Sequence, residues 1–178
     1  MKNTFLQRLI GAVSLDVAIY EEVEADRGAT AQALLVVVLS SLSAGIGARG
    51  LGSMSVANVG FFSVLALMAW MAWALVTLQV GGRLLPEPQT KVDVGELLRT
   101  TGFAAAPGIL RLFGVLPGVT LPVFALCAVW MLAAMIVAVR QALDYTSTGR
   151  AIVVCVIGWA LAIGLAIAVG LFFGPTVS

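Results

Sequence analysis

The residues best able to do chemistry gather in two charged segments, one near the N-terminus and one later in the chain. The first is an acidic cluster over residues 20–26 that contains Glu21, Glu22 and Glu24. The second contains Arg140 and Asp144, whose spacing predicts that both lie on one face of a helix. Carboxylate and guanidinium groups bind charged partners through strong hydrogen bonds. These five residues form our predicted partner-binding surface.

Two interpretations of the acidic cluster stay open. If the helix before it continues, Glu24 lies within an apolar stripe and Glu21 lies at its edge. An unpaired buried carboxylate is costly, so one of these acids would then pair with an arginine and fix the N-terminal helix to the other helices. The candidate arginines are Arg99, Arg140 and Arg150. In the other interpretation, the helix ends near Tyr20 and the acids are solvated.

Arg140 and Asp144 also allow two interpretations. They form either a docking surface for a partner or lipid head group, or a local ion pair next to a membrane helix. The polar residues 146–149 then predict a short turn into the last apolar segment.

Catalytic and metal-binding groups are scarce in this sequence. It has no histidine, which removes the commonest general base and the commonest metal ligand. It has no phosphate-binding glycine loop and no serine-nucleophile motif. The net charge of +1 leaves too little basic surplus for a nucleic-acid surface. We therefore expect no enzymatic activity, no cofactor, no metal site and no nucleic-acid partner.

The chain is far more apolar than a soluble domain. Apolar residues make up 61% of its 178 residues, charged residues 11%, and the mean hydropathy is +1.07. A soluble domain of this length could not bury so much apolar surface. The composition predicts an all-α bundle of membrane helices in a lipid bilayer. Four apolar segments are long enough to cross, at residues 30–48, 60–80, 118–139 and 151–173.

The segment between the second and third of these allows two assignments. Residues 94–113 could cross a membrane with a helix kink at Pro107, whereas residues 100–110 alone would be re-entrant or interfacial. Five crossings place eight of the ten Lys and Arg residues on the N-terminal side, with Arg49 and Arg111 opposite, and four crossings place seven there. Basic residues favour the cytoplasmic side. We therefore prefer five spans, with the N-terminus in the cytoplasm and the C-terminus outside.

Residues 1–28 form an N-terminal segment ahead of the membrane domain, residues 29–178. Apolar residues recur there at helical spacing, with Arg8 and Glu22 on the opposite side. The apolar stripe consists of Leu6, Ile10, Val13, Val17 and Tyr20. It predicts an amphipathic interfacial helix on the cytoplasmic membrane surface.

Small residues recur every four positions on the last apolar segment, at Gly158, Ala162, Ala166 and Gly170. This spacing lets two helices approach closely. Their partner is either another helix of the same chain, or a second copy of the chain or a different membrane protein.

Three segments together carry a family resemblance. They are LDVAIYEEVEADRGATAQALLVVVLSSL, the proline-broken ELLRTTGFAAAPGILRLFGVLPG, and VWMLAAMIVAVRQALDYTSTGRAIVVCVIGW. In order and spacing they resemble the bacterial branch of the Yip1 domain family. The resemblance implies about five membrane helices in a bacterial inner membrane. The role of the eukaryotic members in vesicle traffic is not carried over.

These observations predict a non-catalytic membrane scaffold or adaptor that binds a membrane or cytoplasmic protein through its cytoplasmic face. The alternative is a small transporter, channel or lipid-handling protein that uses the proline-broken third span. A polar cavity open to one membrane side would favour this alternative. A closed apolar bundle with a charged cytoplasmic face would favour the adaptor.

Overall fold

The computed structural model describes residues 3–51, 56–91 and 93–173, and these ranges contain helices and turns but no strand. The α-helices are α1 (Phe5–Val13), α2 (Val17–Ala25), α3 (Ala29–Gly47), α4 (Val56–Gln79), α5 (Val94–Phe103), α6 (Thr120–Ala142) and α7 (Thr148–Phe173). Two 3-10 helices, η1 (Ala48–Leu51) and η3 (Ala106–Val115), and one π-helix, η2 (Val80–Leu84), lie between them. The predicted all-α fold class is confirmed for these residues.

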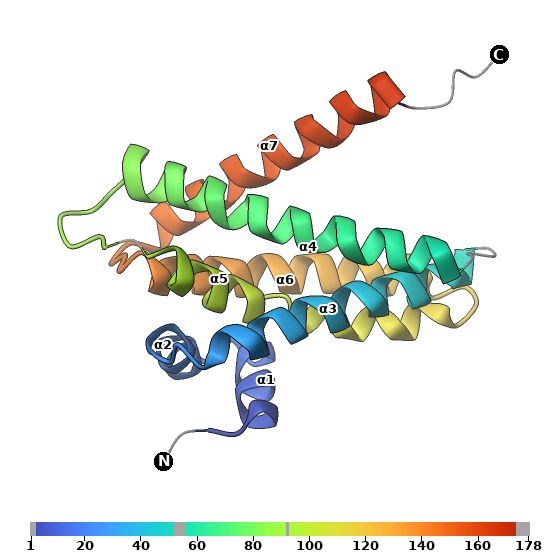
Figure 1. The fold of residues 1–178 in the computed structure, drawn as a ribbon, viewed down its shortest axis with the longest axis horizontal. Coiled ribbons are helices and arrows are strands. Elements are labelled where there is room, and N and C mark those ends of the chain that lie inside the picture. The colour runs from blue at the N-terminus through green and yellow to red at the C-terminus, as the bar shows by residue number, and fades with distance from the viewer. Residues whose placement is uncertain (1–2, 52–55, 92, 174–178) are drawn as a thin grey trace.

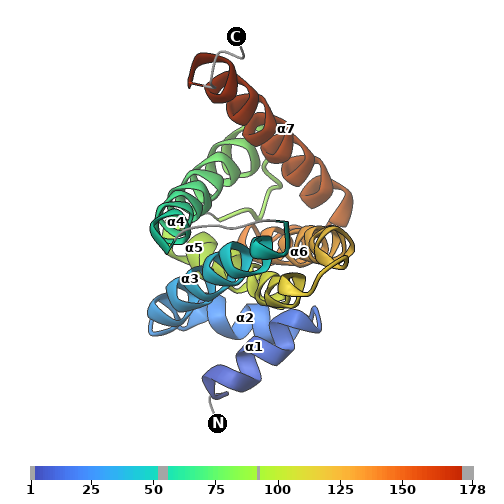
Figure 2. The ribbon, with the colours of Figure 1, turned by 90° about the vertical axis from the view of Figure 1, so that its right-hand side faces the viewer.

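Most of the helices run along one bundle axis. In Figure 1, α3, α4 and α6 lie side by side along the long axis, and α7 diverges from them. The short helices α1 and α2 lie across this axis, beside the start of α3 (Figures 1 and 2). We call the end of the bundle next to α2 the N-terminal end, and the end next to η1 the opposite end.

The N-terminal segment forms two helices where the sequence predicts one. Thr4 caps α1 through reciprocal hydrogen bonds with Gln7. The chain then turns at Leu15, whose φ of 61° is left-handed. Asp16 begins α2, because its side chain accepts a hydrogen bond from the amide of Ala18.

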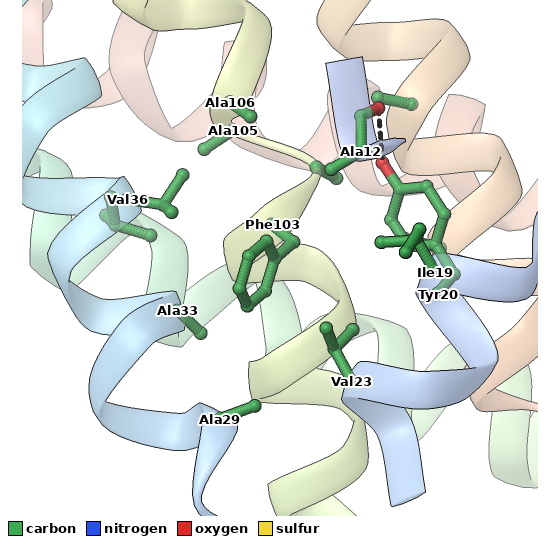
Figure 3. Packing of buried hydrophobic residues seen from close by; sticks show 14 residues of the cluster. Ala12, Ile19, Tyr20, Val23, Ala29, Ala33, Val36, Phe103, Ala105 and Ala106 are labelled. Carbon is green, nitrogen blue, oxygen red and sulfur yellow. Dashed lines mark hydrogen bonds between the residues drawn. The ribbon is translucent and has the colours of Figure 1, made fainter. Parts of the chain in front are cut away.

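This turn divides the predicted apolar stripe. Leu6 and Ile10 of α1 are 61% and 57% exposed, whereas Tyr20 of α2 is fully buried. The Tyr20 hydroxyl donates a hydrogen bond to the carbonyl of Ala12 at 3.2 Å (Figure 3). Helix α2 therefore packs into the core, while α1 keeps an exposed apolar side.

The segment around Pro107 is broken, not kinked. Helix α5 ends at Phe103, and η3 begins at Ala106 with Pro107 in its first turn. Proline has no N–H to bond the carbonyl of Phe103, so α5 cannot continue through it. The two ten-residue pieces still pass along the whole bundle, because α5 packs against α2 and η3 packs against η1.

The break is buried in the core. Phe103 is fully buried and lies between Val23 of α2 and Ala33 and Val36 of α3 (Figure 3). Helix α3 makes its most extensive contact with η3, which also packs on α6. The break is therefore enclosed by α2, α3 and α6.

Two helices of the described residues, α3 and α6, are long and apolar enough to cross a membrane. They contain 19 and 23 residues and match two predicted spans within a few residues at each end. The structure therefore confirms a helical fold with two segments of spanning length, and the number of five spans stays a prediction.

Candidate functional site

Four of the five predicted partner-binding residues line one cleft at the N-terminal end of the bundle. Glu21 and Glu24 come from α2, while Arg140 and Asp144 come from the end of α6 and the turn after it. Glu96 of α5 adds a further acid that sequence reasoning did not select. The volume of this acidic cleft is about 510 Å³.

Hydrogen bonds to α5 and α6 fix α2 beside the cleft. The Arg99 guanidinium donates to the backbone carbonyls of Val23 and Glu24, the first of these at 3.0 Å. The amide of Gln141 donates to the Glu21 carboxylate at 3.0 Å. The last carbonyls of a helix lack partners and attract cations, so Arg99 is a suitable cap for α2. Arg99 thus fixes the N-terminal segment through main-chain oxygens, not through the predicted ion pair with a carboxylate.

Glu24 experiences uncompensated negative charge in this cleft. Partial burial and the nearby carboxylates of Glu96, Asp144 and Glu21 raise its pKa from 4.5 to about 7, while Arg99 opposes this shift. Like charges in a desolvated site disfavour ionisation. A cationic group entering the cleft would therefore find an acid that its own charge helps to ionise.

Glu22 lies outside the cleft and belongs to a buried ion-pair network. It accepts hydrogen bonds from Nε and Nη2 of Arg8 at 2.9 and 2.7 Å, and from the Asn3 amide at 3.0 Å. Arg8 is only 2% exposed and also contacts Asp26 at 2.8 Å and Gln32 at 3.0 Å. The network joins α1, α2 and α3.

Hydrogen bonds within this network favour the charged forms of Arg8 and Glu22. Burial acts to lower the pKa of Arg8, but its hydrogen bonds to Asp26 and Glu22 raise it overall. Burial likewise acts to raise the pKa of Glu22, but hydrogen bonds from Arg8 and Asn3 lower it overall. Both groups are therefore charged at neutral pH, and Glu22 has a structural role that its sequence position does not reveal.

Arg140 and Asp144 do not share a helix face as predicted. Helix α6 ends at Ala142, and Asp144 has a left-handed φ of 52°. Arg140 donates instead to the carbonyl of Tyr145 at 3.3 Å, and no ion pair with Asp144 occurs in the described ranges. The turn therefore places both side chains along the cleft wall.

Sequence reasoning missed Glu87, which lies beside the cleft. Its carboxylate accepts hydrogen bonds from the amide and hydroxyl of Thr146 at 2.9 and 2.7 Å, and Arg150 lies 3.6 Å away. The hydrogen bonds from Thr146 lower the pKa of Glu87 to about 2. These contacts join the loop after η2 to the start of α7. The negative charge of Glu87 also stabilises the N-terminus of α7. The signal in the sequence is an acid held between Pro86 and Pro88.

The small-residue stripe is described only at its first member. Gly158 of α7 packs against the indole of Trp73 in α4, where a Cβ would lie 2.8 Å from the ring. This contact is within the chain. The side chains of Ala162, Ala166 and Gly170 lie outside the described residues.

Searches against family models, curated proteins and solved structures find no match to this chain. The resemblance to the Yip1 domain family therefore stays a prediction. Over the residues that the structure describes, no three acidic or cysteine side chains come together in a way that could hold a metal ion.

Proposed function

We propose that the chain is an integral membrane protein with about five spans, an N-terminus in the cytoplasm and a C-terminus outside. Helices α4 and α7 contain 24 and 26 residues, enough to cross beside α3 and α6. The α5–η3 segment supplies the fifth crossing.

The exposed side chains of α6 support this proposal. Leu121, Leu126 and Val129 are 70%, 63% and 69% exposed, and only 22% of the most apolar stretch of α6 is buried. Such a surface is unfavourable in water and suits lipid. The acidic cleft then lies at the cytoplasmic end, where the positive-inside rule places the N-terminal side.

The protein's proposed role is that of a non-catalytic scaffold or adaptor. A basic segment of a membrane or cytoplasmic partner would occupy the acidic cleft. The observation that carries this role is the convergence of acids from α2, α5 and the α6–α7 turn on one cleft, with the pKa of Glu24 raised by burial and by these acids. Complementary charge favours encounter and specificity in such contacts.

A crosslinking experiment in native membranes tests this role. Ala25 is exposed on the cleft rim, and in this experiment a photo-crosslinking amino acid replaces it. We expect a specific protein adduct through a lysine- or arginine-rich segment. The triple substitution Glu24→Gln, Glu96→Gln and Asp144→Asn should abolish the adduct, because it removes three charges from the cleft.

The control removes acids elsewhere. Asp16→Asn and Asp93→Asn together delete two charges at helix N-caps, where asparagine caps as well as aspartate. Normal crosslinking in this control and its loss in the triple variant support the adaptor. Equal adducts in both variants would contradict the role of the cleft.

A second candidate function is lipid handling, and a separate cavity along the bundle favours it. This alternative shares the membrane location but uses different residues.

A further inference from the structure

An apolar cavity of about 620 Å³ lies among α3, α4, α6, α7 and η3, distinct from the acidic cleft. Figure 2 shows α4 and α7 on one side of this region and α3 and α6 on the other. Its volume is typical of pockets that hold organic ligands. The lining on α3 runs from Val37 to Gly45, about 12 Å along the bundle at ~1.5 Å per residue, and continues to Ala48 at the start of η1. The cavity therefore extends along the bundle axis.

Large aromatic and flexible apolar side chains line this cavity, opposite small residues of α3. Trp70 and Trp73 of α4 and Trp159 of α7 line it, together with Met131 and Met135 of α6. Methionine and tryptophan adapt to irregular apolar ligands through large polarisable surfaces. Such a wall suits an acyl chain.

Two buried donors on this wall lack hydrogen-bond partners within the described ranges. They are Nε of Arg111 and Nε1 of Trp73. An unpaired buried donor is costly, so each requires an acceptor. Trp70, by contrast, donates to the Thr101 hydroxyl at 3.2 Å. Both unsatisfied groups are hydrogen-bond donors. A ligand that satisfies them must therefore have oxygen acceptors.

Arg111 adds a positive charge at the opposite end of the bundle. Its guanidinium lies 5.6 Å from the centre of the Phe124 ring, and no described acid pairs with it. Gly47 makes its position possible, since a Cβ there would overlap the Arg111 carbonyl oxygen. Arg111 is half-buried, and a partly desolvated cation without a described counterion favours an anionic ligand.

We propose that this cavity binds an anionic phospholipid from the membrane leaflet at the opposite end. One acyl chain fills the apolar space, and oxygens of the phosphate and ester groups accept hydrogen bonds from Arg111 and Trp73. A phospholipid supplies the three required properties together, namely a long apolar chain, acceptor oxygens and negative charge. This site rests on the proposed membrane location, but it is independent of the acidic cleft and of any protein partner.

Tryptophan quenching by brominated lipid tests the proposal. The purified full chain in detergent is titrated with phosphatidylglycerol that carries brominated acyl chains, and with the corresponding phosphatidylcholine. Three of the four tryptophans line the cavity. We expect saturable quenching by the anionic lipid at about one molecule per chain. Quenching by the zwitterionic lipid should require a several-fold higher concentration.

Two variants with matched controls locate the site. Arg111→Gln should weaken the anionic lipid about tenfold, the scale of one charge-assisted hydrogen bond, whereas Arg49→Gln at the same end should not. Ala128→Phe fills the cavity and should abolish saturation, whereas Val129→Phe on the exposed side of α6 should not. Ala128→Phe also decides the case if Arg111→Gln fails to fold.

Unsaturable quenching, equal binding of both lipids, or equal effects of each variant and its control would overturn the proposal.

Discussion

At the residue scale, burial and neighbouring charge decide what each acid does. Glu22 and Glu24 are two positions apart, yet Glu22 faces Arg8 and Glu24 faces other acids. Hydrogen bonds lower the pKa of Glu22, whereas burial and like charge raise that of Glu24. The same residue type therefore stabilises one helix junction and leaves a neighbouring cleft with unbalanced charge.

Glu24 should make the stability of the protein depend on pH. Its pKa is about 7 in the folded protein and about 4.5 in the unfolded chain, so the folded state binds the Glu24 proton more tightly. This contribution to folding stability is fully present below about pH 4.5 and is lost as pH rises through about 7. We expect the free energy of unfolding to fall by about 1–2 kcal/mol between pH 5 and pH 8, allowing for solvent screening. Glu24→Gln should remove this loss.

Unfolding curves in detergent at several pH values measure this effect. Asp93→Asn is the control, since it removes an acid outside the cleft and keeps the cap of α5. Glu87 does not interfere, because its lowered pKa affects stability only at acidic pH, between about 4.5 and 2. A Glu24→Gln profile that follows the wild type would contradict the assignment.

At the scale of elements, the sequence predicts helices better than their interruptions. The predicted span 30–48 corresponds to α3 and 118–139 corresponds to α6, because long apolar runs determine such helices. The turn at Leu15 is not predictable, since a left-handed φ is rare for a leucine. The apolar stripe predicts that Arg8 lies on the exposed polar side of the helix. Because of the turn at Leu15, Arg8 is buried instead.

Close packing between α3 and η3 should depend on Gly47. A Cβ at this position would overlap the Arg111 carbonyl oxygen, so Gly47→Ala must separate the two elements. We expect a loss of about 2 kcal/mol in the free energy of unfolding. Gly149→Ala provides the control, because its Cβ would meet its nearest neighbour, Ser147, at an ordinary 3.5 Å.

Chemical unfolding of both variants separates crowding from a general effect of glycine replacement. Alanine at 149 should be neutral or slightly stabilising, since it lies in the first turn of α7. An equal loss in both would contradict the packing argument.

At the scale of the whole molecule, contacts between distant segments favour the proposed arrangement of five crossings over one of four. Thr146 donates hydrogen bonds to the Glu87 carboxylate, so the loop after η2 and the α6–α7 turn lie at the same end of the bundle. The Arg111 carbonyl lies against Gly47, so the end of η3 meets the end of α3 at the opposite end. Four crossings would place residues 87 and 146 on opposite sides of the membrane. Composition alone cannot make this distinction, because it depends on long-range contacts.

Cysteine labelling in intact cells should therefore detect the arrangement of five crossings. In a background with Cys127→Ala and Cys155→Ala, single cysteines replace Arg49, Gln89, Val115 and Gly149, all outside the predicted membrane core. A membrane-impermeant maleimide should label positions 49 and 115 from outside, and positions 89 and 149 only after permeabilisation. With four crossings the result at position 149 reverses, because the α6–α7 turn then faces outward, and position 115 becomes protected. Positions 89 and 49 serve as internal references, since both topologies place them alike.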